Sequence, residues 1–363
     1  MIVAIDVTTL RGRISGVGYY TARIVEHLAA AVGHEVDELL LLTNGSVDRA
    51  LPTKARLVEG FRFPIRSVWM QFLLPLLLRK LRPDLVHYTN YLAPALRTGP
   101  YVVSIHDMSL TRTPEHHTLR KKWLTASLVP RVARAARLVL TPSLATRKDV
   151  IDDLHLPGGR VIPIPYAAAE MFRPVAERPR YSGLDRPYFL FVGTIEPRKN
   201  LVRLLDAFAQ FSAASPGVNL VLTGQRGWKC EEIYARARRP DVADRVILLD
   251  YVEEASLPAL YSHALACVYP SLFEGFGFPV VEAMSCGTPV LTSNRTSLAE
   301  IGEGAALLVN PEDTRAITDG LLALAGDAGL RADLRKRGLA RAAIFSWDET
   351  GRRTLAAYLQ ALG

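Results

Sequence analysis

Short apolar runs recur along the chain, and they constrain its fold more than any other feature. Segments with helical spacing and turn residues separate these runs. A continuous, largely β-branched apolar run is typical of a strand in a parallel sheet that is covered on both faces. Strands that alternate with helices predict doubly wound α/β domains. The clearest runs are Ile2–Ile5, Leu85–Tyr88, Tyr101–Ile105, Leu138–Thr141, Tyr188–Val192 and Ala266–Tyr269.

The length of the chain predicts more than one domain. Its 363 residues are too many for one ordinary core and suit two domains. We expect a first domain over residues 1–170, a second over 171–345, and a terminal helix over 346–363. The stretch 167–187 is rich in proline and lacks periodicity, so it is predicted to link the domains.

Charge and cysteine content narrow the class of protein. The formal charge of +8 and the pI near 9.5 favour anionic partners: nucleotide diphosphates, an acidic membrane surface or nucleic acid. The three cysteines lack paired spacing, which indicates a reducing compartment. The N-terminus lacks the features of a signal peptide, and the apolar stretch 72–78 is too short to span a membrane. We therefore expect a cytoplasmic protein, at most peripheral at the inner face of a membrane.

The stretch Tyr269–Pro289 combines a strand end, a glycine-rich loop and a helix start. Pro279 suits the first helical turn, and Gly287 suits the C-terminal cap. Free N–H groups and the helix dipole make such a helix start an anion site. Glu274 in the loop and Glu282, predicted in the first helical turn, bracket that site. A diphosphate with a polyol on each side, as in a sugar nucleotide, fits this pattern; the alternative is a tight turn with two solvated glutamates.

A basic turn follows the strand Tyr188–Val192. Arg198 and Lys199 stand just before a helix predicted over Leu201–Phe211. Two cations at a helix start can neutralise a diphosphate that gains charge as its glycosidic bond breaks. The alternative is an exposed basic turn.

Two further features lie in the first half of the chain. His106 follows the strand Tyr101–Ile105 directly, at the edge where open α/β sheets bind ligands, and Asp107 is placed to orient its ring. Gly16 and Gly18 lie in a predicted turn before a helix starting near Thr21. That turn fails as a dinucleotide fingerprint, and an ordinary βα turn remains an equal alternative.

The spacing Glu274-x7-Glu282 and the stretch from Gly193 to Asn200 resemble the retaining GT-B glycosyltransferases of the large Glu-x7-Glu family (GT4-like), in particular bacterial GDP-mannose-dependent mannosyltransferases. The resemblance implies two Rossmann-like domains facing a central cleft. It also implies a C-terminal helix that crosses back onto the first domain.

The resemblance also implies roles for residues of this chain. Glu282 would accept hydrogen bonds from the donor ribose, and Glu274 would hold a hydroxyl of the hexose. Arg198 and Lys199 would bind the diphosphate, and His106 would contact the transferred sugar. The remaining donor-binding candidates are Gly16, Gly18, Gly193, Thr194, Tyr251, Val252, Phe276, Gly277 and Phe278.

The same resemblance implies a reaction without metal or cofactor. The arginine, the lysine and backbone N–H groups would replace the cation that other transferases use. In the usual proposal for this family the acceptor attacks from the front face, with no covalent nucleophile. The implied donor is GDP-mannose, with UDP-glucose or a deoxysugar nucleotide as alternatives. The implied acceptor is a glycan or lipid-linked oligosaccharide in polysaccharide or O-antigen synthesis.

A basic segment leaves other partners open. The stretch 120–137 is predicted to be an amphipathic helix with a solvated charged face; contact with anionic lipid is the sharper alternative. Its basic residues are Arg120, Lys121, Lys122, Arg131, Arg134 and Arg137. A nucleic-acid binder is disfavoured because no stacking aromatics interleave with the cations. A nucleotide-sugar epimerase of the same architecture is disfavoured because it should lack the Glu-x7-Glu loop.

Overall fold

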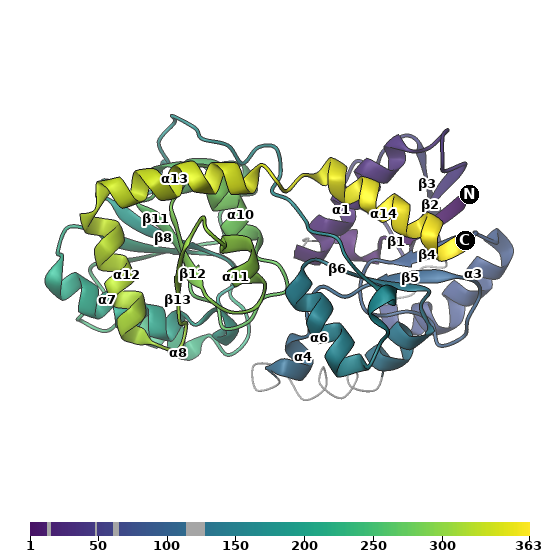
Figure 1. Ribbon diagram of the computed structural model, residues 1–363, viewed down its shortest axis with the longest axis horizontal. Coiled ribbons are helices and arrows are strands. Elements are labelled where there is room, and N and C mark those ends of the chain that lie inside the picture. Colours follow the sequence, from purple (N-terminus) through teal and green to yellow (C-terminus); the bar gives the residue numbers. More distant parts are fainter. Residues whose placement is uncertain (13–15, 48, 61–64, 114–127) are drawn as a thin grey trace. The chain divides into compact units, whose positions relative to one another are not determined.

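The computed structural model describes residues 1–12, 16–47, 49–60, 65–113 and 128–363. The chain forms two compact units. The first comprises Met1–Tyr166 together with Ser346–Gly363, and the second comprises Ala167–Phe345. Each unit has parallel strands at its centre and helices around them (Figure 1).

The first unit contains a seven-stranded parallel sheet in the order β3-β2-β1-β4-β5-β6-β7. Its strands are β1 (Ile2–Asp6), β2 (Glu38–Thr43), β3 (Ala55–Glu59), β4 (Leu85–Tyr88), β5 (Tyr101–Ser104), β6 (Leu138–Thr141) and β7 (Val161–Pro163). Its helices include α1 (Gly16–Ala30), α2 (Arg66–Val68), η2 (Trp69–Leu73), α3 (Leu74–Leu81), α4 (Ser109–Arg112), residues 128–135, α6 (Leu144–Leu154) and α14 (Trp347–Leu362), with the 3-10 turns η1 (Thr8–Leu10) and η4 (Gly158–Arg160).

The second unit contains a six-stranded sheet in the order β10-β9-β8-β11-β12-β13, again parallel. Its strands are β8 (Tyr188–Val192), β9 (Asn219–Thr223), β10 (Val246–Asp250), β11 (Ala266–Tyr269), β12 (Val290–Ser293) and β13 (Leu307–Val309). Its helices include α7 (Leu201–Ala214), α8 (Glu231–Ala237), α9 (Leu257–His263), α10 (Phe278–Ser285), α11 (Thr296–Gly302), α12 (Thr314–Gly326) and α13 (Ala328–Ala342), with the 3-10 turns η5 (Pro197–Lys199) and η6 (Glu254–Ser256). The two predicted doubly wound, Rossmann-like domains are confirmed.

Burial explains why most strands were predictable and β3 was not. All residues of β4, β5, β6, β8, β9 and β11 are buried, which matches their continuous apolar runs. In contrast, β3 pairs only with β2 at one edge of its sheet, and most of its residues are exposed or half-buried. An edge strand of this kind carries no apolar run to reveal it.

The first helix begins earlier than predicted. Gly16 and Gly18 lie in the first turn of α1 rather than in a loop, so the predicted glycine turn is wrong at these positions. The buried face of α1 includes Tyr20, Ile24 and Leu28. Packing of such a face outweighs the low helix propensity of glycine.

The stretch 167–187 packs on the second unit instead of forming a free linker. Phe172 is buried and meets the ring of Tyr261 edge-on, with 6.0 Å between the ring centroids. The backbone N–H of Val175 donates to the Ser262 hydroxyl over 3.1 Å. The prolines of this stretch therefore mark irregular backbone that belongs to the second unit.

The terminal helix α14 is part of the first unit. The Ser346 hydroxyl caps it by accepting from the backbone N–H of Glu349. Tyr358, on its buried face, lies 2.6 Å from Nδ1 of His87 on β4. A residue 271 positions away in the sequence thus completes the polar interior beside β4.

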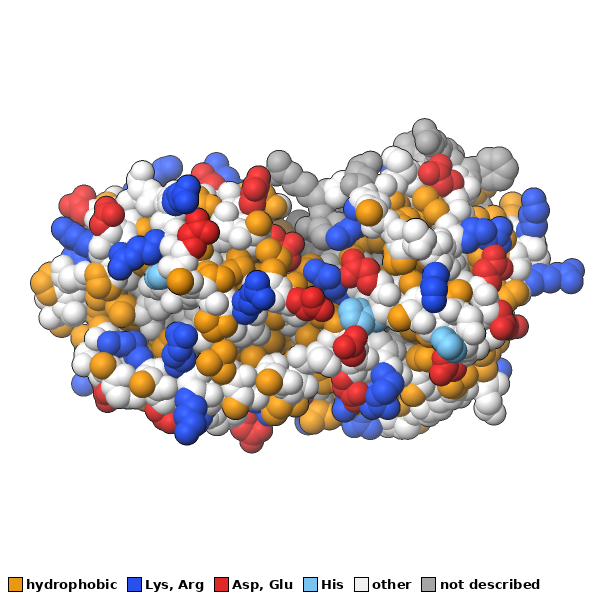
Figure 2. Space-filling view, turned by 90° about the horizontal axis from the view of Figure 1, so that it is seen from above, with side chains coloured by type: hydrophobic (Ala, Val, Ile, Leu, Met, Phe, Trp, Pro, Cys, Tyr) orange, Lys and Arg blue, Asp and Glu red, His pale blue; other side chains and the backbone are white. Residues whose placement is uncertain are grey.

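The side of the molecule shown in Figure 2 has no large patch made of positive side chains alone. There, Lys and Arg side chains alternate with Asp and Glu side chains. The basic helix predicted over 120–137 is described only in part. Residues 120–127, and with them the suggested lipid contact, lie outside the described residues, whereas residues 128–135 are helical. No helix in the described part of the chain is long and apolar enough to cross a membrane.

Two glycine loops of the second unit pack backbone against backbone. A Cβ atom on Gly224, whose φ is +148°, would lie 1.9 Å from the carbonyl oxygen of Gly193. Backbone hydrogen bonds join the same loops, from Gly193 to Thr223 and from Ile195 to Gln225, each over 2.9 Å. Only glycine at position 224 permits this approach.

We therefore expect Gly224→Ala to lower the melting temperature far more than Gly304→Ala. Gly304 also has positive φ, +66°, but a Cβ there would meet nothing within 4 Å. The control carries the backbone strain alone, about 1 kcal/mol, whereas Gly224→Ala adds a clash with rigid backbone. Thermal unfolding of both variants measures the difference, and equal shifts would contradict the packing described.

Candidate active site

The candidate site lies where the strand order of the second sheet reverses. Strands β8 and β11 are neighbours there, although they are far apart in the sequence. In open α/β sheets, ligands bind at the carboxyl ends of the strands at such a point of reversal. The loops that follow these two strands carry the two motifs predicted from sequence, the basic turn after β8 and the acidic loop after β11.

The basic turn is held by its own asparagine. Pro197–Lys199 forms the 3-10 turn η5, and Asn200 adopts a left-handed backbone with φ of 62°. The Asn200 side-chain amide donates to the carbonyls of Pro270 and Pro311, over 3.0 and 2.6 Å. The turn is thereby tied both to the loop after β11 and to the segment after β13.

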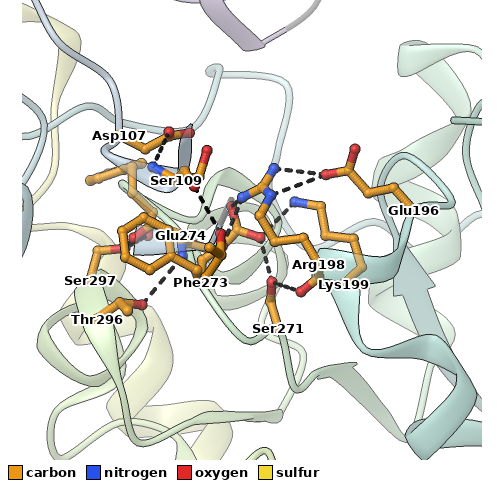
Figure 3. A network of polar contacts seen from close by, with 12 residues as sticks. Asp107, Ser109, Glu196, Arg198, Lys199, Ser271, Phe273, Glu274, Thr296 and Ser297 are labelled. Atoms are coloured by element: carbon orange, nitrogen blue, oxygen red, sulfur yellow. Dashed lines mark hydrogen bonds and ion pairs between the residues drawn. The ribbon is translucent and has the colours of Figure 1, made fainter. Parts of the chain in front are cut away.

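Glu274 joins the two motifs in one buried cluster (Figure 3). Its Oε1 accepts from Lys199 Nζ over 2.6 Å, and its Oε2 accepts from Arg198 Nη1 over 2.9 Å. The hydroxyls of Ser271 and Tyr269 lie 2.7 and 3.1 Å from the same Oε1. Glu274 is 8% exposed and Lys199 7% exposed, so these ion pairs are shielded from solvent.

Arg198 is held from both sides. Its Nη2 lies 2.8 Å from Oε1 of the buried Glu196, and its Nη1 also donates to the carbonyl of Phe273 over 2.7 Å. These contacts hold the guanidinium in one orientation. The four charged side chains of the cluster, Glu196, Arg198, Lys199 and Glu274, cancel in formal charge.

The ionisation of the cluster follows from burial and neighbouring charge. Burial alone would raise the pKa of Glu274, but Arg198 and Lys199 hold that pKa at about 2. Burial and the charge of Arg198 lower the pKa of Lys199, against the opposing pull of Glu274. The carboxyl is thus ionised at neutral pH, and a carboxylate is an acceptor with no proton to give.

The acidic loop enters α10 through a glycine with positive φ, a conformation that other residues adopt only with strain. Gly277 has φ of +122°, and a Cβ there would lie 2.7 Å from Leu298 Cδ2. The Ser297 hydroxyl lies 2.9 and 2.6 Å from the carbonyls of Glu274 and Phe276. Pro279 in the first turn and Gly287 just past the end, with φ of 70°, confirm the predicted helix signals.

Glu282 lies one turn further along than predicted. The helix α10 begins at Phe278, so Glu282 is its fifth residue and lies outside the first turn. Its Oε2 accepts from the hydroxyl of Tyr261 on α9, over 3.0 Å. Burial raises the pKa of Glu282 to about 8; the Tyr261 hydrogen bond opposes this shift and Glu254 adds to it. Glu282 and Glu274 therefore have opposite ionisation tendencies and different partners.

The other predicted donor-binding residues of this unit line the same edge of the sheet. Gly193 and the exposed Thr194 follow β8. Tyr251, 54% exposed, and the buried Val252 follow β10. The carbonyl of Asp250 accepts from the backbone N–H of Gly224, so the loop after β10 is tied to the one after β9.

In the first unit, His106 lies half-buried after β5. Its Nδ1 lies 2.8 Å from the Tyr166 hydroxyl and its Nε2 lies 2.7 Å from the Thr89 carbonyl. Asp107 does not orient the ring as predicted, because both ring nitrogens contact other groups; Asp107 Oδ1 accepts from the backbone N–H of Ser109. His106 and Asp107 line a cavity of about 180 Å³. The rest of its lining is Val17, Asn90, Tyr91, Ile105, Met108, Leu110, Thr111 and Val129.

Several residues of the two sites were missed by reading the sequence. They are Glu196, Tyr269, Ser271, Tyr261 and Tyr166. Glu196 and Ser271 stand within three residues of predicted members, so proximity in the motif was a usable signal. Tyr166 and Tyr261 reach their partners only through the tertiary fold.

The described residues hold no group of three or more His, Cys, Asp or Glu side chains placed to bind a metal ion.

Comparison with known families finds matches over both halves. Residues 176–341 match the family model described as glycosyl transferases group 1. Residues 14–167 match the model described as Glycosyltransferase Family 4. The chain is 32% identical over 379 residues to the O-antigen chain mannosyltransferase B of Escherichia coli, covering 95% of this chain and 96% of that protein.

Solved structures share the fold at lower identity. Sucrose-phosphate synthase from Thermosynechococcus elongatus matches with a TM-score of 0.79 and 21% identity, over 99% of this chain and 98% of that one. The HepE protein of Anabaena in complex with UDP-glucose matches with a TM-score of 0.76 and 18% identity, over 99% and 100%. The chain shares the GT-B fold of these structural neighbours.

The raised pKa of Glu282 has a measurable consequence for stability. A carboxyl whose pKa rises from about 4.5 to about 8 on folding stabilises the protein below pH 4.5, and this contribution is lost as pH rises to 8. Glu282→Gln keeps an acceptor for Tyr261 and removes the titration. We expect the melting temperature of Glu282→Gln to gain on that of the wild type between pH 5 and pH 8.5, and thermal unfolding measures this. A difference that is constant with pH would contradict the assigned pKa.

Proposed function

Because the chain belongs to the glycosyltransferases described by the group 1 and family 4 models, we propose that it transfers mannose from GDP-mannose to a glycan or lipid-linked acceptor. The proposed setting is polysaccharide or O-antigen synthesis. Glycosyl transfer is the activity of the family; the sugar, the nucleotide and the acceptor are the proposal.

One observation carries the proposal: two cations held by an acid at the switch point of the second sheet. Lys199 uses two of its three N–H donors on Tyr269 and Glu274, over 2.6 Å each. Arg198 is fixed by Glu196 and Glu274. Preoriented donors lose little freedom when a charged group arrives, so they stabilise a leaving diphosphate efficiently. We assign the diphosphate to Arg198 and Lys199, with the N-terminus of α10 beside it.

The two glutamates take the flanking hydroxyl groups in this proposal. Oε1 of Glu274 has contacts with Lys199, Tyr269 and Ser271. Oε2 accepts from Arg198, and a carboxylate oxygen accommodates a second hydrogen bond, here from a hexose hydroxyl. Glu282 accepts from the ribose.

The remaining assignments follow from position. The backbone of Phe276 and Gly277 borders the hexose, and Phe278 stands at the start of α10 beside the phosphate. Gly193 and Thr194 border the diphosphate, and Tyr251 and Val252 border the base.

The bonding of Glu274 also supports transfer without a covalent intermediate on this residue. A carboxylate that is held by two cations and two hydroxyls is a weak nucleophile. Front-face attack, in which the acceptor hydroxyl gives its proton to the leaving phosphate, uses the same cations and yields retention. The cations also take the place of a metal ion in this scheme.

On the first unit, we assign the cavity beside His106 to the acceptor. Its volume of about 180 Å³ is on the scale of one sugar ring, and it combines apolar walls with Asn90, Asp107 and Thr111. Apolar surface with a few polar groups is typical of small-molecule sites.

Mannose is favoured because the relative that matches this chain over 95% of its length is named a mannosyltransferase, at 32% identity. The UDP-glucose complex of HepE shares only 18% identity and supports the fold alone. The nucleotide is therefore the part of the proposal that most needs a direct test.

Thermal shift with GDP, UDP and dTDP is that test, followed by product analysis with the matching sugar nucleotides. A ligand at 100 times its Kd stabilises the folded state by about 2.7 kcal/mol. We expect GDP to give the largest shift, and mannose transfer from GDP-mannose to persist in EDTA. A largest shift with UDP or dTDP would overturn the GDP assignment, and no shift with any nucleotide would overturn the donor site.

Lys199→Ala removes one preoriented donor from the leaving group. Loss of such a donor costs about a hundredfold or more in kcat. The matched control is Arg239→Ala, an exposed arginine of the same unit, which should leave kcat unchanged. Initial rates of nucleotide release, with melting temperatures to verify folding, decide the question. A folded Lys199→Ala enzyme within about threefold of wild type would contradict the role.

A further inference from the structure

Both ring nitrogens of His106 are occupied inside the first unit. Nε2 lies 2.7 Å from the carbonyl oxygen of Thr89, and Nδ1 lies 2.8 Å from the hydroxyl of Tyr166. A carbonyl oxygen only accepts hydrogen bonds, so Nε2 carries the proton. In a neutral imidazole Nδ1 then accepts, and the Tyr166 hydroxyl must be the donor.

Tyr166 is itself fixed by rings from two helices. Its ring centroid lies 4.5 Å from that of Tyr20 on α1, and it stacks on Trp347 of α14 at 6.0 Å with 13° between the planes. Tyr166 is 4% exposed. The Thr350 hydroxyl of α14 donates to the carbonyl of Pro165 over 2.7 Å, which pins the backbone next to Tyr166.

The position of this stack in the chain is unusual. Tyr166 is the last residue of the first unit before the chain enters the second, and Ser346 is the first residue on its return. Trp347 follows Ser346 directly. The chain therefore leaves the first unit at Tyr166 and re-enters it beside Trp347, and these two rings stack on each other. The hydroxyl of Tyr166 also contacts His106.

We propose that Tyr166 is a positioning residue for the transfer reaction: by donating to Nδ1 it holds His106 as a neutral ring, whose proton the Thr89 carbonyl keeps on Nε2, and it fixes how that ring lines the acceptor cavity. In this state His106 contributes shape and a fixed contact to the cavity, and it carries no proton to or from the substrate. The assignment of a catalytic consequence rests on the proposed function; the state of the ring does not.

The surroundings of His106 favour the neutral ring. Burial lowers its pKa, while the Thr89 carbonyl and Asp107 act in the opposite direction. Tyr20 packs edge-on at 5.0 Å between ring centroids, and the second histidine nearby, His87 of β4, also disfavours a charge on either ring. Tyr166 stays neutral as well, because burial raises its pKa well above the ordinary value.

The chain supplies a matched control for removing the Tyr166 hydroxyl. Tyr358 on α14 is equally a buried tyrosine whose hydroxyl contacts a histidine nitrogen, Nδ1 of His87, over 2.6 Å. Tyr166→Phe and Tyr358→Phe each remove one hydroxyl from a buried tyrosine–histidine pair of the same unit. Only the first pair includes His106.

The first measurement needs no substrate. In protein with 15N-labelled histidine, the signal of His106, assigned by its loss in His106→Gln, reports the tautomer. We expect wild type and Tyr358→Phe to show a protonated Nε2, a bare Nδ1 and no titration between pH 5.5 and 8.5. Tyr166→Phe keeps the Thr89 contact and therefore the proton on Nε2, but it removes the donor to Nδ1, so its His106 should titrate in that range. A His106 that titrates in wild type, or that is unchanged in Tyr166→Phe, would overturn the proposal.

The second measurement is kinetic and uses the sugar nucleotide that the enzyme accepts. Tyr166→Phe should lower kcat about tenfold, the effect of one hydrogen bond, with the KM for the donor unchanged. Tyr358→Phe should stay within about twofold of wild type. Equal losses in both variants would reduce Tyr166 to a structural role. Absence of transfer in wild type would fault the proposed function and leave the tautomer result standing.

Discussion

The ion pairs between Glu274 and the cations Arg198 and Lys199 are the interaction on which the second unit depends. Burial of these charges apart from one another would be unfavourable, and the cost is offset because each cation lies within 2.9 Å of Glu274. The pairing forces the turn after β8 and the loop after β11 together at the point where the strand order reverses. The reversal of strand order and the buried ion pairs therefore both occur at the carboxyl ends of β8 and β11.

The loops around the cluster make that place rigid. The Asn200 amide ties the basic turn to Pro270 and Pro311, and the glycine contact at Gly224 ties the loop after β9 to the one after β8. Rigid placement has a direct chemical value, because donors fixed before the reaction need no reorganisation when charge develops on the leaving group. The first unit uses a different device: its polar interior around His87 and His106 is neutral and is held by tyrosine hydroxyls.

Features carried by local sequence patterns were predictable, and features made by the tertiary fold were not. The apolar strands, Pro279, Gly287 and the residues of both charged motifs follow local rules that act over a few residues. The start of α1 at Gly16 was missed because packing of its buried face overrides glycine propensity. Glu282 was predicted in the first helical turn, but α10 begins at Phe278, directly after Gly277 with its positive φ, so Glu282 falls in the second turn.

The partners of the site residues were the least predictable part. Asp107 was expected to orient His106 because it is adjacent in sequence, yet the ring contacts are made by Tyr166 and Thr89. Tyr166 precedes a segment that resembled a linker, and its supports come from α1 and α14. Side chains that meet only through the tertiary fold of the first unit leave no spacing in the sequence to find them by.

The most direct test of the cluster is the affinity gained from the second phosphate. Isothermal titration of the best-binding nucleoside diphosphate and its monophosphate gives the ratio of the two Kd values, in wild type and in Lys199→Met. If Arg198 and Lys199 hold the diphosphate, the wild-type ratio is at least about tenfold, one strong charge-assisted contact, and it collapses in the variant. A ratio that is the same in both proteins would contradict this account.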